Sequence, residues 1–323
     1  MTINFNADPY YDDFDETKNF HRILFKPGVA VQARELTQLQ TSIQNQIKRF
    51  GDNIFKEGTI VHGGERAYDR NYEAVKLQAS YNDGTTTYNA NTELTGLIGD
   101  EIYGITSGVR ALVVNVVASN TAGDPPTIYV KYTNSGTNKQ TYTFADNEVI
   151  INSFNNKKFK SLVTNATAIG TAYTITAGVA YVKGYFVYFP RQTLILNKYE
   201  NIDTAIVVFN VNESIKTFTQ DSTLLDPASG SYNFAAPGAD RYYIELVIGK
   251  KEWQPTTIVD DDVIELARIQ GSNIIKENKN TEYAVLQDTL ARRTYDESGD
   301  YIVRPFDIKV IEHLQSPTQR LGY

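Results

Sequence analysis

The residues that most often carry catalysis or bind metals are sparse in this sequence and do not cluster. Its 323 residues include three histidines, His21, His62 and His313, and no cysteine. No two histidines have the short spacing that a zinc site on one helix uses. Without cysteine, neither a disulfide nor a thiolate metal site can form. The sequence therefore predicts no metal site.

Carboxylates are plentiful, and two acidic runs stand out, residues 12–16 (DDFDE) and 260–262 (DDD). Neither follows the spacing of a calcium-binding EF-hand loop. A glycoside hydrolase needs two carboxyl groups about 5 to 9 Å apart in a cleft, and a sequence does not give that distance. We interpret both runs as solvated surface. The first is the better candidate for docking against a basic partner.

Motifs for a nucleophile or a bound phosphate are missing. Residues 104–108 (GITSG) place Ser107 beside a glycine, but they do not match G-x-S-x-G, and a turn-rich β context does not suit a nucleophile elbow. The pair Gly63-Gly64 is too short to cradle a phosphate, and no P-loop occurs. We therefore predict that the protein is not an enzyme, with no catalytic residue and no cofactor.

The charge pattern excludes further classes of partner. The net charge is −7, and lysine and arginine are scattered along the chain. Nucleic-acid binders concentrate basic residues in a patch, so nucleic acid is not an expected partner. No apolar run approaches the roughly 20 residues that cross a bilayer, and the acidic N-terminus lacks the features of a secretory signal. We expect no membrane insertion, and the lack of cysteine suits synthesis in a reducing cytoplasm.

The strongest structural signal is a helix over residues 29–50, which contain neither proline nor glycine. Its apolar side chains recur every three or four residues, as a helical stripe requires: Leu36, Leu39, Ile43, Ile47, Phe50 and, just beyond, Ile54. Two arrangements fit this stripe. It can lie on the chain's own domain, or it can form a short coiled coil about an oligomer axis, with Gln46 at an otherwise apolar position and glutamines paired between chains.

The rest of the sequence predicts antiparallel β-structure. After Gly58, short segments rich in Val, Ile, Tyr and Thr alternate with turn signals. Residues 178–196 predict a hairpin that turns at Gly184, and residues 242–248 and 263–269 predict strands.

The expected fold class is mainly β with an N-terminal α-helix, in three parts. Residues 1–58 form an extended arm, ended by Pro27-Gly28, and an assembly helix. Residues 59–92 and 156–323 form one or more main antiparallel β-domains. Residues 93–155 form a small inserted β-module, because polar, turn-rich segments flank them.

Tyrosines occur in three groups, at Tyr10-Tyr11, at residues 181–188 and at residues 242–243. Tyrosine is enriched at interfaces but also packs on the faces of sheets. We interpret the last two groups as core residues. Tyr10 and Tyr11, on the arm, are the better interface candidates.

One resemblance rests on the N-terminal segments. Residues 8–15 (DPYYDDFD), 20–28 (FHRILFKPG), 31–40 (VQARELTQLQ) and 54–58 (IFKEG) follow one another. This order resembles the start of a group of tailed-bacteriophage virion proteins, from the baseplate or the base of a tail fibre, in which such an arm leads into such a helix. Looser similarity extends over most of the chain outside residues 93–155. Members of that group are commonly longer, so this chain is expected to be a short member or part of a longer protein.

The resemblance implies a structural protein of the virion, made in the host cytoplasm, with other tail or baseplate proteins as partners. We expect self-association, with a homotrimer about the helix preferred to a heteromeric wedge, and an arm that becomes ordered only against its partner. The rival functions are receptor or carbohydrate binding through exposed aromatic residues, and capsule depolymerisation. The expected assembly interface comprises Tyr10, Tyr11, Phe14, Phe20, Leu24, Phe25, Leu36, Leu39, Ile43, Ile47 and Phe50.

Overall fold

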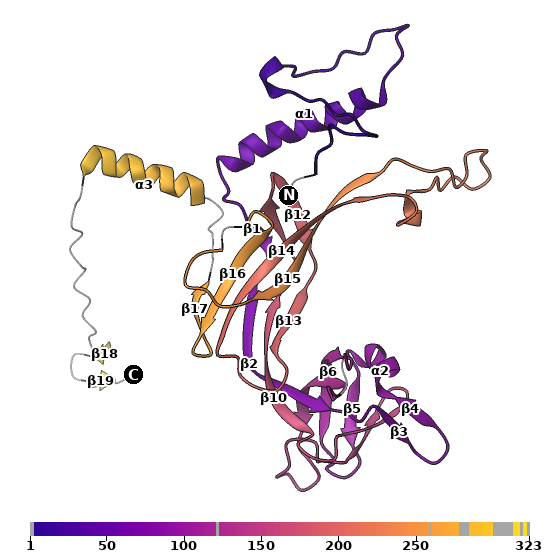
Figure 1. Cartoon of the computed structure of the whole chain (residues 1–323). Helices are drawn as coiled ribbons and strands as arrows, with labels where there is room; N and C mark the ends of the chain where they lie inside the picture. The colour runs from indigo at the N-terminus through magenta and orange to yellow at the C-terminus, as the bar shows by residue number, and fades with distance from the viewer. Residues whose placement is uncertain are drawn as a thin grey trace.

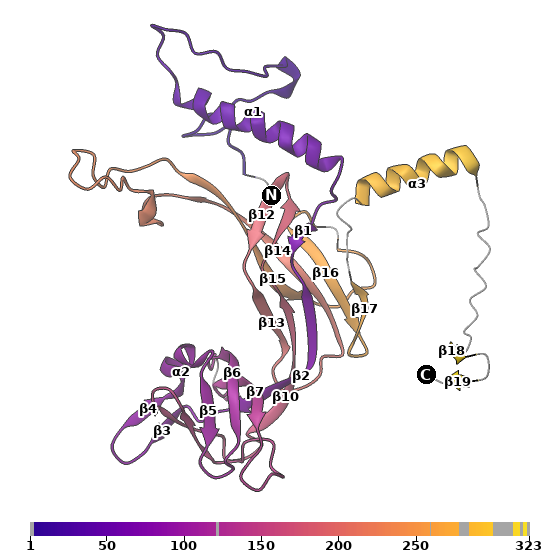
Figure 2. The same ribbon diagram turned by 180° about the vertical axis from the view of Figure 1, so that it is seen from behind.

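The computed structural model describes residues 3–120, 123–258, 260–277, 284–299, 313–316 and 319–321. The molecule is elongated, and its elements form three successive levels along its length (Figures 1 and 2). Helix α1 and the arm lie at one end, a group of long strands forms the middle, and a smaller β-unit lies at the other end. The predicted fold class, mainly antiparallel β with an N-terminal helix, is confirmed.

Helix α1 (Ala33–Asp52) begins later than the predicted residue 29. Gly28 has a φ of 79°, and the N–H of Val29 donates to the Lys26 carbonyl at 3.2 Å, so a turn occupies these residues. Gln32 is still extended, and its N–H donates to the Glu35 carboxylate at 2.9 Å. The turn and this helix cap take up residues 29–32, because capping requires a non-helical residue before the first turn.

Three sheets enclose the core of the middle level. One comprises β1 (Thr59–Gly63), β11 (Gly178–Val182) and β12 (Tyr185–Phe189). A second has the order β15 (Arg241–Lys251), β14 (Thr204–Lys216), β16 (Val263–Gln270) and β17 (Asn273–Glu277). The third side is formed by β13 (Gln192–Asn197), β10 (Thr167–Ile175) and β2 (Arg66–Lys76). The β11–β12 pairing confirms the predicted hairpin, and β15 and β16 confirm the two predicted strands.

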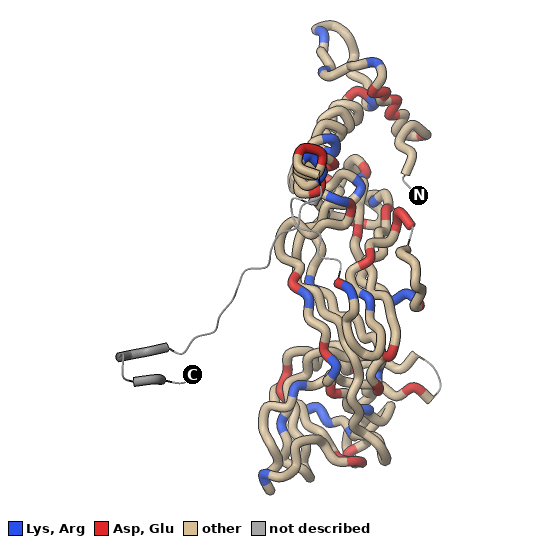
Figure 3. Tube along the Cα trace, turned by 90° about the vertical axis from the view of Figure 1, so that its left-hand side faces the viewer, with Lys and Arg blue, Asp and Glu red and all other residues tan. Residues whose placement is uncertain are grey.

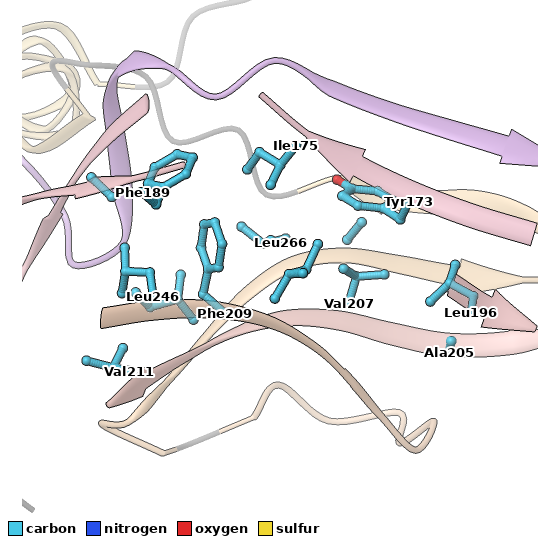
Figure 4. Close-up of a cluster of buried hydrophobic side chains, with 14 of the residues drawn as sticks. Tyr173, Ile175, Phe189, Leu196, Ala205, Val207, Phe209, Val211, Leu246 and Leu266 are labelled. Carbon is cyan, nitrogen blue, oxygen red and sulfur yellow. The ribbon is translucent and has the colours of Figure 1, made fainter. Parts of the chain in front are cut away.

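The core between these sheets is continuous. Five successive residues of β14, Ala205 to Phe209, are buried, and Ala205, Val207 and Phe209 belong to this core. Phe189 and Phe209 pack with ring centroids 5.0 Å apart. Figure 4 shows side chains from several strands pointing toward one another, including those of Tyr173, Ile175, Leu196, Leu246 and Leu266. This packed core holds the β11–β12 turn at the edge where α1 rests.

The smaller unit has its own core. It contains β3 (Ser80–Asn82), β4 (Thr87–Asn89), α2 (Ala90–Glu93), η2 (Leu94–Leu97), β5 (Glu101–Gly104), β6 (Arg110–Val117), β7 (Thr127–Asn134), β8 (Val149–Asn152) and β9 (Lys158–Lys160). The end of β2 pairs with β7, so one sheet of eight strands runs through both parts. The expected module, residues 93–155, lies within this unit. Its core also includes Leu77, Ala90 and Phe159, outside those bounds.

Residues 104–108 (GITSG) form a turn that packs around a buried carboxylate. Glu148, 2% exposed, accepts hydrogen bonds from the N–H groups of Thr106, Ser107 and Ala145 at 2.7, 2.5 and 2.8 Å. A Cβ on Gly104 would lie 2.3 Å from an oxygen of Glu148. Glycine is therefore needed there for packing around a structural carboxylate.

Beyond β17 comes helix α3 (Ala284–Ser298), and Gly299 follows it with a φ of 65°. The last described elements are β18 (His313–Ser316) and β19 (Gln319–Leu321).

Candidate assembly surface

Helix α1 contacts its own chain through its polar face. Gln38 donates to Asp13 and Thr41 donates to Asp12, each at 2.5 Å. Gln44 donates to the backbone carbonyl at the β11–β12 turn at 2.6 Å. Hydrogen bonds therefore hold this side of the helix, and Asp12 is buried beneath it with 6% exposure.

The C-terminal end of α1 is anchored on the hairpin. A Cβ added to Gly51 would lie 2.5 Å from the Tyr181 ring, so the ring packs directly on the helix backbone. The Tyr181 hydroxyl lies 2.7 Å from the Asp52 carboxylate, to which it donates, and 3.0 Å from the Lys48 carbonyl. Burial tends to raise the pKa of Asp52, but the hydrogen bonds from Lys48 and Tyr181 outweigh it and hold that pKa below its usual value.

The apolar stripe of α1 faces outward, away from these contacts. The exposed fraction is 50% for Leu36, 37% for Leu39, 56% for Ile43, 40% for Ile47 and 68% for Phe50. A surface helix normally turns its apolar face to its own core. Of the two arrangements that the sequence left open, packing of the stripe on its own domain is not the one observed. Contiguous exposed apolar surface is typical of sites where proteins meet other molecules.

The arm lies along α1 and the start of β15. Glu16 accepts a hydrogen bond from Asn45 at 3.3 Å, and Figure 3 shows acidic residues where the arm runs beside the helix. Tyr10 donates to Asp240 at 2.7 Å, which raises the pKa of Tyr10 to about 12. An arm ordered only by a partner is therefore not what the structure shows, because its carboxylates bond to the polar face of the helix.

Two groups of charged and aromatic residues fix the beginning of the arm. The Phe5 and Tyr242 rings meet edge to face with centroids 5.0 Å apart. Tyr242 donates to Glu213 at 2.6 Å, and Lys183 contacts Glu213 and lies 2.5 Å from Asp262. The Lys183 ammonium lowers the pKa of Asp262 to about 2.

The predicted interface residues of the arm divide into two sets. Tyr10 and Phe14 are partly buried against their own chain, whereas Tyr11 is exposed. The side chains of Phe20, Leu24 and Phe25 are exposed, at 72%, 76% and 49%. A groove of about 520 Å³ lies between the arm and α1. Phe14, Phe20 and Ile23 line it from the arm, Leu39 and Ile43 line it from the stripe, and polar residues of both segments complete it.

Sequence reasoning missed other exposed apolar residues. Val29 and Val31, which precede α1, are exposed, and the sequence signal for them was two β-branched residues just after Pro27-Gly28. The sequence also showed no helical or strand periodicity that would single out the exposed apolar side chains of two further segments. These are Tyr232 and Phe234 between β14 and β15, and Leu286, Leu290 and Tyr295 on α3.

Features of other kinds of site lie elsewhere on the chain, including a groove of about 730 Å³ lined by five aromatic side chains: Tyr185, Phe186, Tyr188, Tyr242 and Tyr243. Within the described part of the chain, no group of three His, Asp or Glu residues is placed to hold a metal ion. A hollow on the smaller unit is lined by one aromatic residue, Tyr103, with Ile105, Arg110 and Lys139 among its other residues, and by no carboxylate. None of the described helices has both the length and the hydropathy to cross a membrane.

A family model described as a domain of unknown function (DUF4815) matches residues 8–113 and 134–322. The chain belongs to this family. The match includes the arm from residue 8, α1 and the whole middle level. It omits residues 114–133, which comprise the second half of β6, its connection to β7 and nearly all of β7. No curated protein and no solved structure matches the chain.

Proposed function

We propose that the protein is a structural subunit of a bacteriophage tail, which assembles into the baseplate or the base of a tail fibre through its arm and α1. The observation that carries the proposal is the orientation of α1. Its polar face is bonded to its own chain, and its apolar stripe is exposed. The resemblance of residues 8–58 to tailed-phage virion proteins supplies the place in the particle.

The energetics suit an assembly surface. Fully burying a Leu, Ile or Phe side chain contributes about 1.5–3 kcal/mol. Because the five stripe residues are roughly half exposed, covering them would contribute on the order of 5 kcal/mol per chain. The partners expected on this basis are further copies of the chain, as a homotrimer, or other tail proteins, as a heteromeric wedge.

The proposal is tested in the phage that encodes the chain. Mass spectrometry of purified particles should detect the protein, and Ile43→Lys should remove it from them because a charge would be buried in the contact. Phe154→Lys, a matched change at an apolar residue 85% exposed on the smaller unit, should leave incorporation unchanged. Absence of the protein from wild-type particles would contradict the proposal.

The same pair of variants separates the rival functions. A receptor-binding role on the smaller unit predicts that Phe154→Lys particles assemble but adsorb poorly to the host. A depolymerase predicts capsule hydrolysis by the isolated chain, whatever the state of α1.

A further inference from the structure

The connection between β14 and β15 is a long hairpin that projects from the body of the molecule. Figures 1 and 2 show residues 217–240, the projecting hairpin, running outward from these two strands. The N–H of Asp226 donates to the Ala236 carbonyl at 3.0 Å. The N–H of Gly238 donates to the Leu224 carbonyl, also at 3.0 Å. The two sides of the hairpin are thus bonded to each other, and a preformed element loses less conformational entropy when it binds.

The projecting hairpin is aromatic at its tip and acidic overall. Tyr232 is fully exposed, and Phe234 and Phe218 are exposed at 57% and 37%. Residues 217–240 contain three aspartates and neither lysine nor arginine. Aromatic side chains are enriched where proteins meet one another. The composition therefore suits contact with an apolar surface that carries positive charge.

A second exposed segment has the opposite charge. It is the arm bend, residues 18–31, the loop that leads into α1 (Figure 1). Its charged residues are Lys18, Arg22 and Lys26, with no carboxylate, and none of the three forms an ion pair with another described residue. Apolar side chains with exposed fractions from 49% to 76% lie among them: Phe20, Leu24, Phe25, Val29 and Val31. The arm bend is therefore a basic, apolar surface.

The arm bend borders a place for an aromatic side chain. The groove between the arm and α1, of about 520 Å³, lies within the size range of pockets that enclose small organic groups. Its carboxylates are bonded within the chain, Asp13 to Arg34, Asp15 to the N–H of Thr17 and Glu35 to the N–H of Gln32. Lys18 and Arg22 also line the groove and are left as cations for a ligand.

The two segments do not meet within one chain. The arm touches the hairpin at its base, where Tyr10 donates to Asp240 at 2.7 Å, but beyond this point Figure 1 shows the two reaching outward separately. One chain thus carries two exposed surfaces that match in charge and in apolar character. A different protein would have to supply a complement to each of them, whereas a second copy of the chain supplies both.

We propose that the projecting hairpin of one copy docks on the arm bend of the next, with its aromatic tip in the groove between the arm and α1. This inference rests on the proposed use of the arm and α1 in assembly and names what occupies them. The contact is heterologous, so it joins copies head to tail and closes a ring where the rotation permits. Opposite charges favour this pairing over hairpin against hairpin or bend against bend.

Crosslinking between two variants tests the contact. The chain has no cysteine, so Ala30→Cys on the arm bend and Ser231→Cys on the hairpin each introduce one exposed thiol. The two variants are produced together with different tags and treated with a short bis-maleimide reagent. A product of twice the 36.3 kDa chain mass that carries both tags is expected.

The matched control replaces the hairpin thiol by Ser153→Cys, at an exposed serine of the smaller unit. Little linking between Ser153→Cys and Ala30→Cys is expected. Equal yields from the two combinations would show random collision and overturn the inference.

Light scattering over a range of concentrations gives a second measurement. Phe234→Ala and Arg22→Glu should each raise the dissociation constant about tenfold or more, because each removes a central part of the contact. Phe154→Ala and Lys131→Glu, exposed on the smaller unit, should leave it unchanged. An unchanged circular dichroism spectrum checks the fold of every variant. A wild type with the mass of a single chain at every concentration would overturn the inference.

The outcomes for the contact and for the function are separable. Copies that link through Ala30→Cys and Ser231→Cys, in a protein that is missing from purified particles, support the inference and contradict the tail function. A protein that is present in particles but is a single chain in solution contradicts the inference and leaves the tail function standing.

Discussion

Strand β14 and helix α1 use the same kinds of apolar residue in opposite ways. The run from Ala205 to Phe209 in β14 is buried, and Phe209, in the core between the sheets, is 1% exposed. Phe50 in α1 is 68% exposed, although the stripe to which it belongs is equally regular. Burial in β14 stabilises the chain's own fold. The stripe of α1 contributes nothing comparable to the single chain, which is why we assign it to assembly.

The largest expected effect comes from removing one phenylalanine from each region. Phe209→Ala should lower the free energy of unfolding by about 3–5 kcal/mol, because it leaves a cavity in the core. Phe50→Ala should change it by less than about 0.5 kcal/mol when the chain is monomeric, since surface changes have small effects. Urea unfolding at low protein concentration measures both. A large loss for Phe50→Ala would mean that the stripe packs within its own chain.

A smaller effect is expected where α1 meets the β11–β12 hairpin. Gly51→Ala would place a methyl group 2.5 Å from the Tyr181 ring, so the helix or the ring must move. We expect a loss of about 1–3 kcal/mol, as for other overpacked sites. Gly96→Ala is the control, because no atom lies within 4 Å of its added Cβ. Equal stabilities of the two variants by urea unfolding would show that α1 is not anchored through this contact.

The smallest expected effect concerns the ion pair at the beginning of the arm. Lys183 lowers the pKa of Asp262 to about 2, below the value of about 3.9 in an unfolded chain. The pairing therefore stabilises the fold above pH of about 4, and this contribution is lost as the pH falls toward 2.

Asp262→Asn should consequently be less stable than the wild type at pH 7, and the difference should disappear near pH 2. Unfolding by urea at a series of pH values measures it. A difference that persisted undiminished at pH 2 would show that the carboxylate acts through something other than its charge.

Local patterns predicted much of the fold. The β11–β12 hairpin follows from Gly184 between two β-rich runs, and its left-handed backbone (φ 85°) is one that glycine adopts readily. The extent of the smaller unit was not predictable in the same way. It depends on the pairing of Ala74 with Tyr129 and on the burial of Phe159, contacts between residues far apart in the sequence.

The sequence by itself predicted a helix over residues 29–50 with one apolar stripe, close to the observed Ala33–Asp52, because helix formation and side-chain periodicity are local properties. Only the tertiary structure decided which face of that helix meets the chain. The amphipathic pattern predicts which side chains share a face of the helix. It does not predict which of the two faces contacts the rest of the same chain. Here Asp12, Asp13 and the β11–β12 turn bond to the polar face, and the apolar side chains of the stripe are left exposed.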